Sequence, residues 1–227
     1  MEMFDGRFTL SEIKDIVERQ PSDYLYPIYT SGQILSVKHD EIYIQYLKLL
    51  LSEKQSLSIL DHGGSYGEHF INVFGSIFEK ENIKKYIIIE DKRICENIKN
   101  RGNIDNVEYR FSINNIDLNQ KFDIIHSNSA IQYCWNDDKI IEKFCLFSPK
   151  YILLLRVPIT LEKQSFYSLQ GFLEKKIPYK FFSFVEIYHF MKKYKYKEIY
   201  NENHYDSEIK EKFMNQYVKN MVFQKDE

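Results

Sequence analysis

The sequence is poor in the residues that mark several large classes of protein. It holds three cysteines, Cys95, Cys134 and Cys145, whose wide spacing and odd number disfavour both a disulfide framework and a zinc site. Five prolines and eight glycines are spread over 227 residues, so no stretch has the composition of a flexible linker. We therefore expect one domain, and the free thiols fit a reducing, cytoplasmic location.

An excess of charge of one sign and long apolar runs are also missing. The formal net charge is −2, which lacks the basic excess typical of nucleic-acid binding, so we expect no nucleic-acid partner. No segment approaches the roughly 18 apolar residues of a membrane span, and Met1–Arg7 has no signal-peptide pattern. Aromatic residues, in contrast, make up 16% of the chain. They suit a large core and a cleft that has apolar walls with polar tips.

Strand-like and helix-like segments alternate after residue 56. Short aliphatic or β-branched runs separated by amphipathic stretches predict a parallel sheet with helices on both faces. The expected strands are Leu57–Leu60, Tyr86–Ile89, Val107–Phe111, Phe122–His126, Tyr151–Leu155, Tyr196–Tyr200 and Met221–Gln224.

Helical signals dominate the residues before this sheet. Thr9 and Glu12 have the spacing of a capping box, and Val37–Leu51 has helical periodicity. Beyond the fifth strand, Pro158–Tyr179 is long, aromatic and weakly periodic, and connections of this length tend to be lids or binding segments. A second capping-box spacing, from Ser183 to Glu186, predicts a helix through Met191.

A glycine turn is the most informative feature of the sequence. Three glycines lie within five residues of the run Asp61-His62-Gly63-Gly64-Ser65-Tyr66-Gly67, between an expected strand and the helix-like stretch Glu68–Phe78. This order brings backbone N–H groups to a charged or nucleoside-bearing ligand. The dinucleotide fingerprint would need glycines at Ser65 and Glu68, and the Gly-Lys-Ser/Thr of a phosphate loop is absent.

With the acid Asp61 two residues before its first glycine, this turn resembles motif I of the class I S-adenosylmethionine-dependent methyltransferases. Two further segments resemble the same family: the strand Tyr86–Ile89 ends at the acid Glu90, and Phe122–Tyr133 is similar to the family's fourth-strand segment. The resemblance implies an α/β, Rossmann-like fold with a seven-stranded, mostly parallel sheet whose seventh strand is antiparallel. It also implies S-adenosyl-L-methionine as cofactor and S-adenosyl-L-homocysteine as product.

The helical periodicity of the first residues and the resemblance together divide the single expected domain, 1–227, into three parts. These are a helical N-terminal cap over 1–55, a cofactor-binding core over 56–157, and a substrate-side insertion with C-terminal strands over 158–227. In the core, the acid and the turn would hold the methionine part of the cofactor, and Glu90 would accept the ribose hydroxyls. The implied cofactor-binding residues are Asp61, His62, Gly63, Gly64, Ser65, Gly67, Glu90, Ser127 and Asn128.

A narrower resemblance is to a bacterial family of candidate methyltransferases found with surface-polysaccharide biosynthesis. The segments that carry it are Gly63–Gly67, Gln132-Tyr133, Arg156-Val157-Pro158, Gln170 and Ile177-Pro178-Tyr179. It implies O-methylation of a small polar acceptor, such as a sugar or nucleotide-activated intermediate of capsule or lipopolysaccharide biosynthesis. The expected substrate-binding residues are Gln132, Arg156, Gln170 and Tyr179, and the expected catalytic residues are His126 and Tyr133, because an alcohol acceptor needs a general base.

Other interpretations of these residues remain open. His126 also fits a buried, hydrogen-bonded position in a strand, His69 fits the surface, and Arg156 fits a structural ion pair. His189 and His204 are further candidates for the base, and the spacing of the histidines suggests no metal site. Rival functions are an N-methyltransferase for a small amine or phosphoramidate-type acceptor, a non-catalytic cofactor-binding partner subunit, and a nicotinamide-dependent oxidoreductase.

Overall fold

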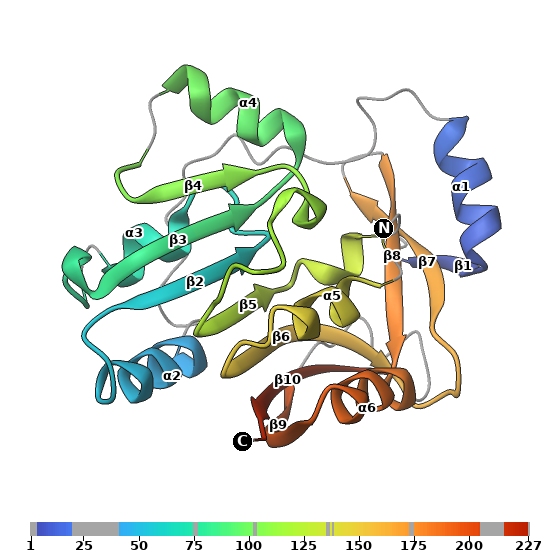
Figure 1. The fold of residues 1–227 in the computed structure, drawn as a ribbon. Coiled ribbons are helices and arrows are strands. Elements are labelled where there is room, and N and C mark those ends of the chain that lie inside the picture. The colour runs from blue at the N-terminus through green and yellow to red at the C-terminus, as the bar shows by residue number, and fades with distance from the viewer. Residues whose placement is uncertain are drawn as a thin grey trace.

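The computed structural model describes residues 4–19, 41–74, 77–101, 104–134, 137, 139–172, 175–204 and 216–226. Its strands form one mixed sheet in the order β1-β7-β8-β6-β5-β2-β3-β4, to which β10 and β9 are added beside β6 (Figure 1). The seven expected strands are all present. Their bounds are β2 Leu57–His62, β3 Ile83–Ile89, β4 Val107–Arg110, β5 Ile124–Asn128, β6 Tyr151–Thr160, β9 Tyr196–His204 and β10 Gln216–Lys225.

These seven strands make the core of the sheet. The neighbours β4, β3, β2, β5 and β6 are all parallel, whereas β10 is antiparallel both to β6 and to β9. The mostly parallel arrangement of these seven strands, with an antiparallel last strand, is therefore confirmed, whereas the expected strand count is too low, because β1, β7 and β8 extend the sheet to ten strands. Because the strands are parallel, their carboxyl ends meet at one edge of the sheet.

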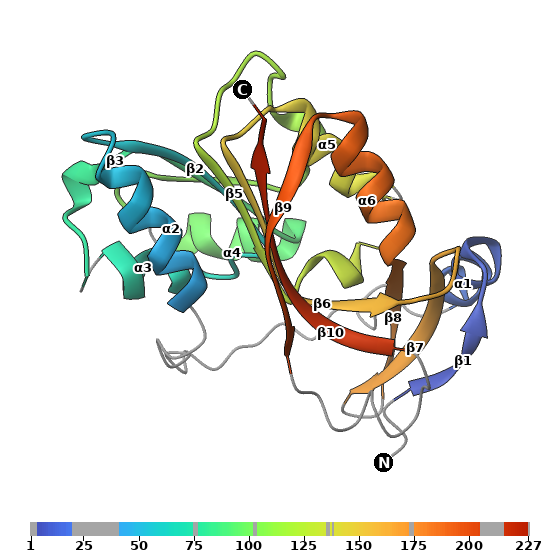
Figure 2. The ribbon, with the colours of Figure 1, turned by 90° about the horizontal axis from the view of Figure 1, so that it is seen from below.

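Helices cover both faces of this core (Figure 2). One buried cluster joins the sheet to α2 (Glu41–Leu51) and α3 (Glu68–Phe74), and a second joins it to α5 (Ile140–Leu146) and α6 (Phe184–Lys193). Coverage on both faces explains why the central strands are almost wholly aliphatic. The remaining elements between the strands are α4 Lys92–Arg101, η3 Lys80–Asn82, η4 Ile113–Asn115 and η5 Ile131–Tyr133.

The N-terminal residues differ from the expected helical cap. Besides α1 (Leu10–Glu18), whose Thr9–Glu12 capping box is confirmed, they contain a strand, β1 (Phe4–Phe8). This strand pairs antiparallel with β7, far along the chain. The partner that makes Phe4–Phe8 a strand is thus a distant segment, which the local helical signals could not reveal. The start of the expected helix over 37–51 lies outside the described residues, which resume at Glu41.

The expectation that Pro158–Tyr179 is a weakly periodic connection is also wrong, because this segment forms strands. It contains the end of β6, all of β7 (Phe166–Phe172) and the first part of β8 (Lys175–Ser183), and β7 and β8 form an antiparallel hairpin. Phe166 faces a buried cluster with Phe181, whereas Tyr167 and Leu169 face a cluster on α1. Since both faces of β7 are covered, the polar and apolar alternation that marks a half-exposed strand is weak.

The helix expected after Ser183 is present, but its capping box is incomplete. Ser183 Oγ accepts the Glu186 N–H at 3.5 Å, as expected for an N-cap. The Glu186 carboxylate turns instead to Ser165, whose backbone N–H donates to it at 3.4 Å. The helix thereby ties itself to the start of the β7–β8 hairpin. Among the described residues, no helix is both long and apolar enough to cross a membrane.

Candidate functional site

The glycine turn lies at the carboxyl edge of the sheet, directly after β2. Gly63 and Gly67 have φ values of +76° and +87°, a region that glycine enters without strain. Ser65 lies in the same region, with a φ of +49°, although it carries a side chain. The Gly63 N–H donates to the Ile89 carbonyl at 2.8 Å, which fixes the turn to the end of β3. A Cβ atom on Gly63 would lie 2.2 Å from the Ala130 Cβ. The turn therefore packs closely against the segment that follows β5.

Glu90 lies beside this turn, at the end of β3. Its Oε2 accepts the Ser65 N–H at 2.9 Å, and its Oε1 accepts the Asp91 N–H at 2.8 Å. Burial raises the pKa of the Glu90 carboxyl above its usual value, and the two N–H donors act in the opposite direction. The structure thus brings together the acid and the turn that the sequence singled out separately.

Asp61 lies beneath the turn and is 0% exposed. Tyr86 Oη donates to its Oδ2 at 2.8 Å, His69 Nδ1 lies 3.2 Å from the same oxygen, and His126 Nδ1 lies 3.2 Å from Oδ1. Burial alone would raise the pKa of Asp61, but the two imidazoles outweigh it and lower this pKa below the usual range. A direct contact between Asp61 and a cofactor would require the carboxylate to exchange one of these partners.

The residues around Asp61 come from several elements. His126 is 0% exposed in β5 and stacks on the Tyr43 ring of α2 at a centroid distance of 4.2 Å, while its Nε2 has no hydrogen-bond partner among the residues that the structure describes. The expectation that His69 lies on the surface is wrong, because its side chain is only 12% exposed and turns toward Asp61. Asp61, His69 and His126 each place an atom of the kind that can ligate a metal, a carboxylate oxygen or an imidazole nitrogen, within 4.8 Å of the other two. The hydrogen bonds from the imidazoles to the carboxylate account for this spacing.

His62 and Ser127 lie on the opposite face, under the same edge. His62 Nδ1 lies 3.1 Å from Ser127 Oγ, and its Nε2 lies 3.3 Å from Cys134 Sγ. Burial lowers the pKa of His62 to about 4 and raises the pKa of the Cys134 thiol to about 12. His62 is therefore a neutral, buried link between β2, β5 and the segment after β5.

The expected substrate residues fall into two neighbouring groups at this edge. In the first, Tyr133 Oη donates to Gln170 Oε1 at 2.9 Å, and the Tyr133 ring meets the Tyr179 ring edge-on at 5.4 Å. The buried Gln132 donates through Nε2 to Ser129 Oγ at 3.0 Å, and within the described part of the chain its Oε1 meets no hydrogen-bond donor. The β7–β8 hairpin thus forms a wall beside the residues that follow β5.

The second group contains Arg156 and Asn128. Arg156 Nε donates to Asn128 Oδ1 at 2.6 Å, so the guanidinium lies against the last residue of β5. The two other candidate bases come from different elements: His189 is exposed on α6, and His204 is the last residue of β9. The structure therefore gathers the expected cofactor residues with Tyr133, Gln132, Gln170, Tyr179 and Arg156.

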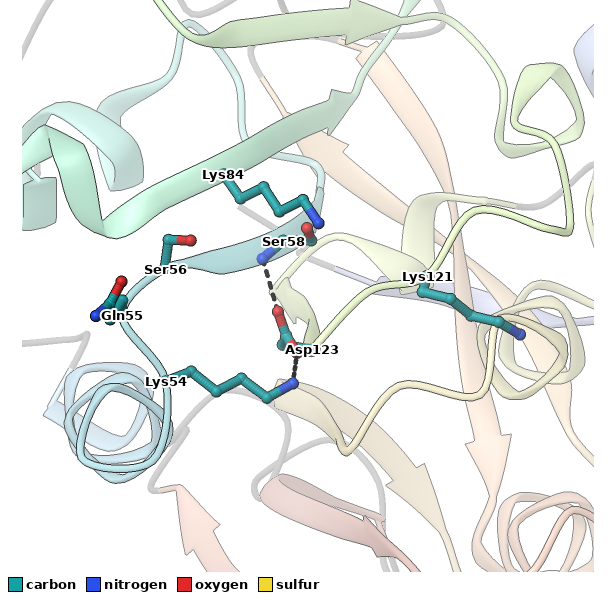
Figure 3. A pocket seen from close by; sticks show the side chains of 7 residues that line it. All are labelled: Lys54, Gln55, Ser56, Ser58, Lys84, Lys121 and Asp123. Carbon is teal, nitrogen blue, oxygen red and sulfur yellow. Dashed lines mark hydrogen bonds and ion pairs between the residues drawn. The ribbon is translucent and has the colours of Figure 1, made fainter.

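A pocket of about 460 Å³ lies elsewhere, at the amino ends of β2 and β3 (Figure 3). Asp123 closes one side of it by accepting the Ser58 N–H at 2.8 Å and by pairing with Lys54. Its lining residues are Lys54, Gln55, Ser56, Ser58, Lys84, Lys121 and Asp123. Ligands of open α/β sheets bind at the carboxyl ends of the strands, so this pocket is not the candidate site.

No protein-family model and no curated protein matches the sequence. Solved structures do match the fold. A candidate S-adenosylmethionine-dependent methyltransferase from Listeria monocytogenes is 14% identical, with a TM-score of 0.58, over 81% of this chain and 97% of its own.

A methyltransferase from Mesorhizobium loti is 11% identical over 80% of this chain and 96% of its own, with a TM-score of 0.52. The 1,6-didemethyltoxoflavin-N1-methyltransferase of Burkholderia thailandensis, solved with S-adenosylhomocysteine bound, is 10% identical with the same TM-score of 0.52. It covers 99% of this chain and 94% of its own. With its parallel core, antiparallel β10 and glycine turn at the carboxyl edge, the chain has the fold of the class I S-adenosylmethionine-dependent methyltransferases.

Proposed function

We propose that the protein is an S-adenosylmethionine-dependent methyltransferase. The observation that carries the proposal is the hydrogen bond between Glu90 Oε2 and the Ser65 N–H, which joins the acid after β3 to the glycine turn after β2. Ligands of open α/β folds bind where these two strands end. The fold shared with methyltransferases supports the same conclusion.

The residues at this edge fit the cofactor. The turn can adopt this packed conformation because Gly63, Gly64 and Gly67 lack a side chain, since a Cβ on each would lie within 3 Å of another atom of the protein. The turn would hold the methionine part of the cofactor, and Glu90 would accept its ribose hydroxyls. We place Ser127 and Asn128 at the reacting end, and we propose that Asp61 and His62 act mainly by holding the turn from below.

When bound, S-adenosylmethionine supplies an electrophilic methyl group. The protein must then align the acceptor, exclude water and take up a proton if the acceptor is an alcohol. Tyr133 is the better placed of the two expected bases, because its hydroxyl meets the β7–β8 wall through Gln170. His126 is 0% exposed, so we propose that it serves this reaction through its hydrogen bond to Asp61.

The proposed acceptor is a small polar molecule methylated on oxygen, such as a sugar or a nucleotide-activated intermediate of a surface polysaccharide. This part rests on the sequence resemblance described above. Methylation of nitrogen in a small amine is the alternative, and the N1-methyltransferase from Burkholderia thailandensis has the same fold. A non-catalytic cofactor-binding subunit would bind S-adenosylhomocysteine equally well and would transfer no methyl group to any acceptor.

Calorimetric titration with S-adenosylhomocysteine and with NAD tests the proposal. We expect S-adenosylhomocysteine to bind one site per chain and NAD to bind weakly or not at all. Glu90→Gln should weaken S-adenosylhomocysteine by about tenfold or more, since about 1.4 kcal/mol of lost hydrogen bonding corresponds to that factor. The matched control, Glu96→Gln on α4, alters an acid that is 57% exposed and should bind like the wild type. Tighter binding of NAD would overturn the proposal.

A further inference from the structure

The pocket at the amino ends of β2 and β3 lies at the opposite edge of the sheet from the glycine turn (Figure 3). Its volume, about 460 Å³, is within the usual range for sites that bind small molecules. All seven residues that line it are polar or charged. A ligand in this pocket would therefore be recognised by charge and by hydrogen bonds, and its chemistry follows from the charges that the lining presents.

Positive charge exceeds negative charge around this pocket. The lining contains one acid, Asp123, and three lysines: Lys54, Lys84 and Lys121. Both oxygens of the Asp123 carboxylate are occupied, because Oδ1 pairs with Lys54 and Oδ2 accepts the Ser58 N–H at 2.8 Å. Lys54 thus cancels the charge of Asp123, and the lining retains two positive charges.

Lys84 and Lys121 carry these two charges. Both residues are exposed, and among the residues that the structure describes neither of them has an ion pair or a hydrogen bond. The next lysine along β3 differs, because Lys85 pairs with Glu108 at 3.3 Å. An anion in the pocket would therefore meet two uncompensated ammonium groups and would displace no carboxylate from them.

Hydrogen bonds fix the segments that carry the lining residues. The Asp123 N–H donates to the Ser58 carbonyl at 2.8 Å, in addition to the bond that the Asp123 side chain accepts, so the segment before β5 is held to β2 twice. Lys85 Nζ donates to Gln120 Oε1 at 3.1 Å, which joins β3 to the residue before Lys121. The backbones on three sides of the pocket are thus held together before any ligand binds.

We propose that this pocket binds a phosphate dianion, free or as the ester of a small molecule, through Lys84 and the hydroxyl groups of Ser56 and Ser58. A phosphate monoester carries a charge of about −2 near pH 7, which matches the two uncompensated lysines. Lysine binds phosphate as a point charge, and hydroxyl groups donate to its oxygens. Figure 3 shows the Lys121 side chain pointing away from Asp123, so Lys84 makes the direct contact and Lys121 adds its charge from a greater distance. The inference does not rest on the proposed methyl transfer, which belongs to the other edge of the sheet.

Calorimetric titration at constant ionic strength tests the site with three probes: inorganic phosphate, glycerol 3-phosphate and glycerol. We expect at least one of the two phosphates to bind one site per chain and glycerol not to bind. Tighter binding of inorganic phosphate would identify the free anion as the source of the dianion, and tighter binding of glycerol 3-phosphate would identify an ester. Acetylation of lysines, followed by mass spectrometry, locates the site: saturating phosphate should protect Lys84 more than the exposed Lys14 of α1.

Variants of exposed lysines test the contacts without threatening the core. Lys84→Gln should weaken the phosphate that binds by about tenfold or more, because it removes a charge-assisted hydrogen bond. Lys121→Gln should weaken it by about threefold, because it removes a more distant charge. The matched control is Lys14→Gln on α1, which changes a lysine that is also exposed and should bind like the wild type.

Two results would overturn the inference. One is that neither phosphate binds better than glycerol, and the other is that Lys84→Gln binds phosphate as tightly as Lys14→Gln does. All three variants should bind S-adenosylhomocysteine like the wild type, because the substituted residues lie away from the carboxyl edge. Failure of S-adenosylhomocysteine to bind the wild type would contradict only the proposed function.

Discussion

Buried polar side chains shape the carboxyl edge of this sheet from below. Asp61 and His62 are consecutive in β2 and point to opposite faces, each to a hydrogen-bonded partner in β5: His126 for Asp61, and Ser127 for His62. Parallel pairing of these residues places the contacts directly across the ladder. Two polar pairs in register hold β2 and β5 at the position where the glycine turn begins.

Stability should depend on pH through His62. Burial lowers its pKa from 6.5 to about 4. Between these values the unfolded chain binds a proton that the folded chain excludes, so the free energy of unfolding falls as the pH falls through this window. The loss should reach roughly 3–4 kcal/mol at most, from about 1.4 kcal/mol for each pKa unit.

Urea unfolding of the wild type and of His62→Asn between pH 6.5 and pH 4 measures this effect. The asparagine retains a hydrogen-bonding group near Ser127 but does not titrate, so the difference between the two proteins isolates the histidine. The wild type should lose more stability than the variant as the pH decreases. Parallel curves would show that His62 takes up its proton in the folded state as readily as in the unfolded chain.

At the scale of elements, local rules of sequence explain most of the core. The runs that became β2 to β6 are aliphatic because both faces are covered, and the Thr9–Glu12 box and the glycine turn depend on residues close in sequence. The pairing of β1 with β7 could not be predicted, because it depends on residues about 160 positions apart. The same holds for His69 and Asn220, whose partners Asp61 and Arg156 meet them only in the folded chain.

The glycine turn should tolerate no side chain at Gly63. An alanine there combines a φ of +76° with a Cβ 2.2 Å from the Ala130 Cβ, so the turn and the segment after β5 would have to separate. We expect Gly63→Ala to lose S-adenosylhomocysteine affinity by at least tenfold and to lower stability by more than about 1 kcal/mol. Calorimetric titration and urea unfolding measure the two effects.

Gly6→Ala is the matched control for backbone strain. Gly6 has a similar φ of +67°, but the atoms nearest to its Cβ would be those of the Phe8 side chain, outside the seven-stranded core. The Gly6→Ala variant should be destabilised by a comparable amount of backbone strain and should retain the affinity for S-adenosylhomocysteine. Equal loss of affinity in both variants would show that the Gly63 effect is one of general stability.

At the scale of the whole molecule, the first and the third part of the expected domain contact each other. The N-terminal β1 and α1 pack on the β7–β8 hairpin, where Arg7 pairs with Glu162 and lies 4.4 Å over the Phe166 ring. In Figure 2 this unit lies beyond the ends of β6 and β10, on the opposite side of the molecule from β3. The segments expected to serve as cap and as substrate-side insertion thus form one unit next to the candidate acceptor residues.

This unit should open without disturbing the cofactor-binding core. Ile13 is 0% exposed in α1 and shares a cluster with Val17, Tyr167 and Leu169, so Ile13→Ala should cost about 2–4 kcal/mol. Amide hydrogen exchange should accelerate in β1, α1 and β7 while β2, β3 and β5 keep their protection, because local unfolding follows cooperative units. The control Ile71→Ala removes the same atoms from a residue that is 50% exposed and should leave exchange unchanged. If the β2 and β5 amides instead lost protection to the same extent as those of β7, the N-terminal unit would unfold together with the core, and the acceptor side could not open on its own.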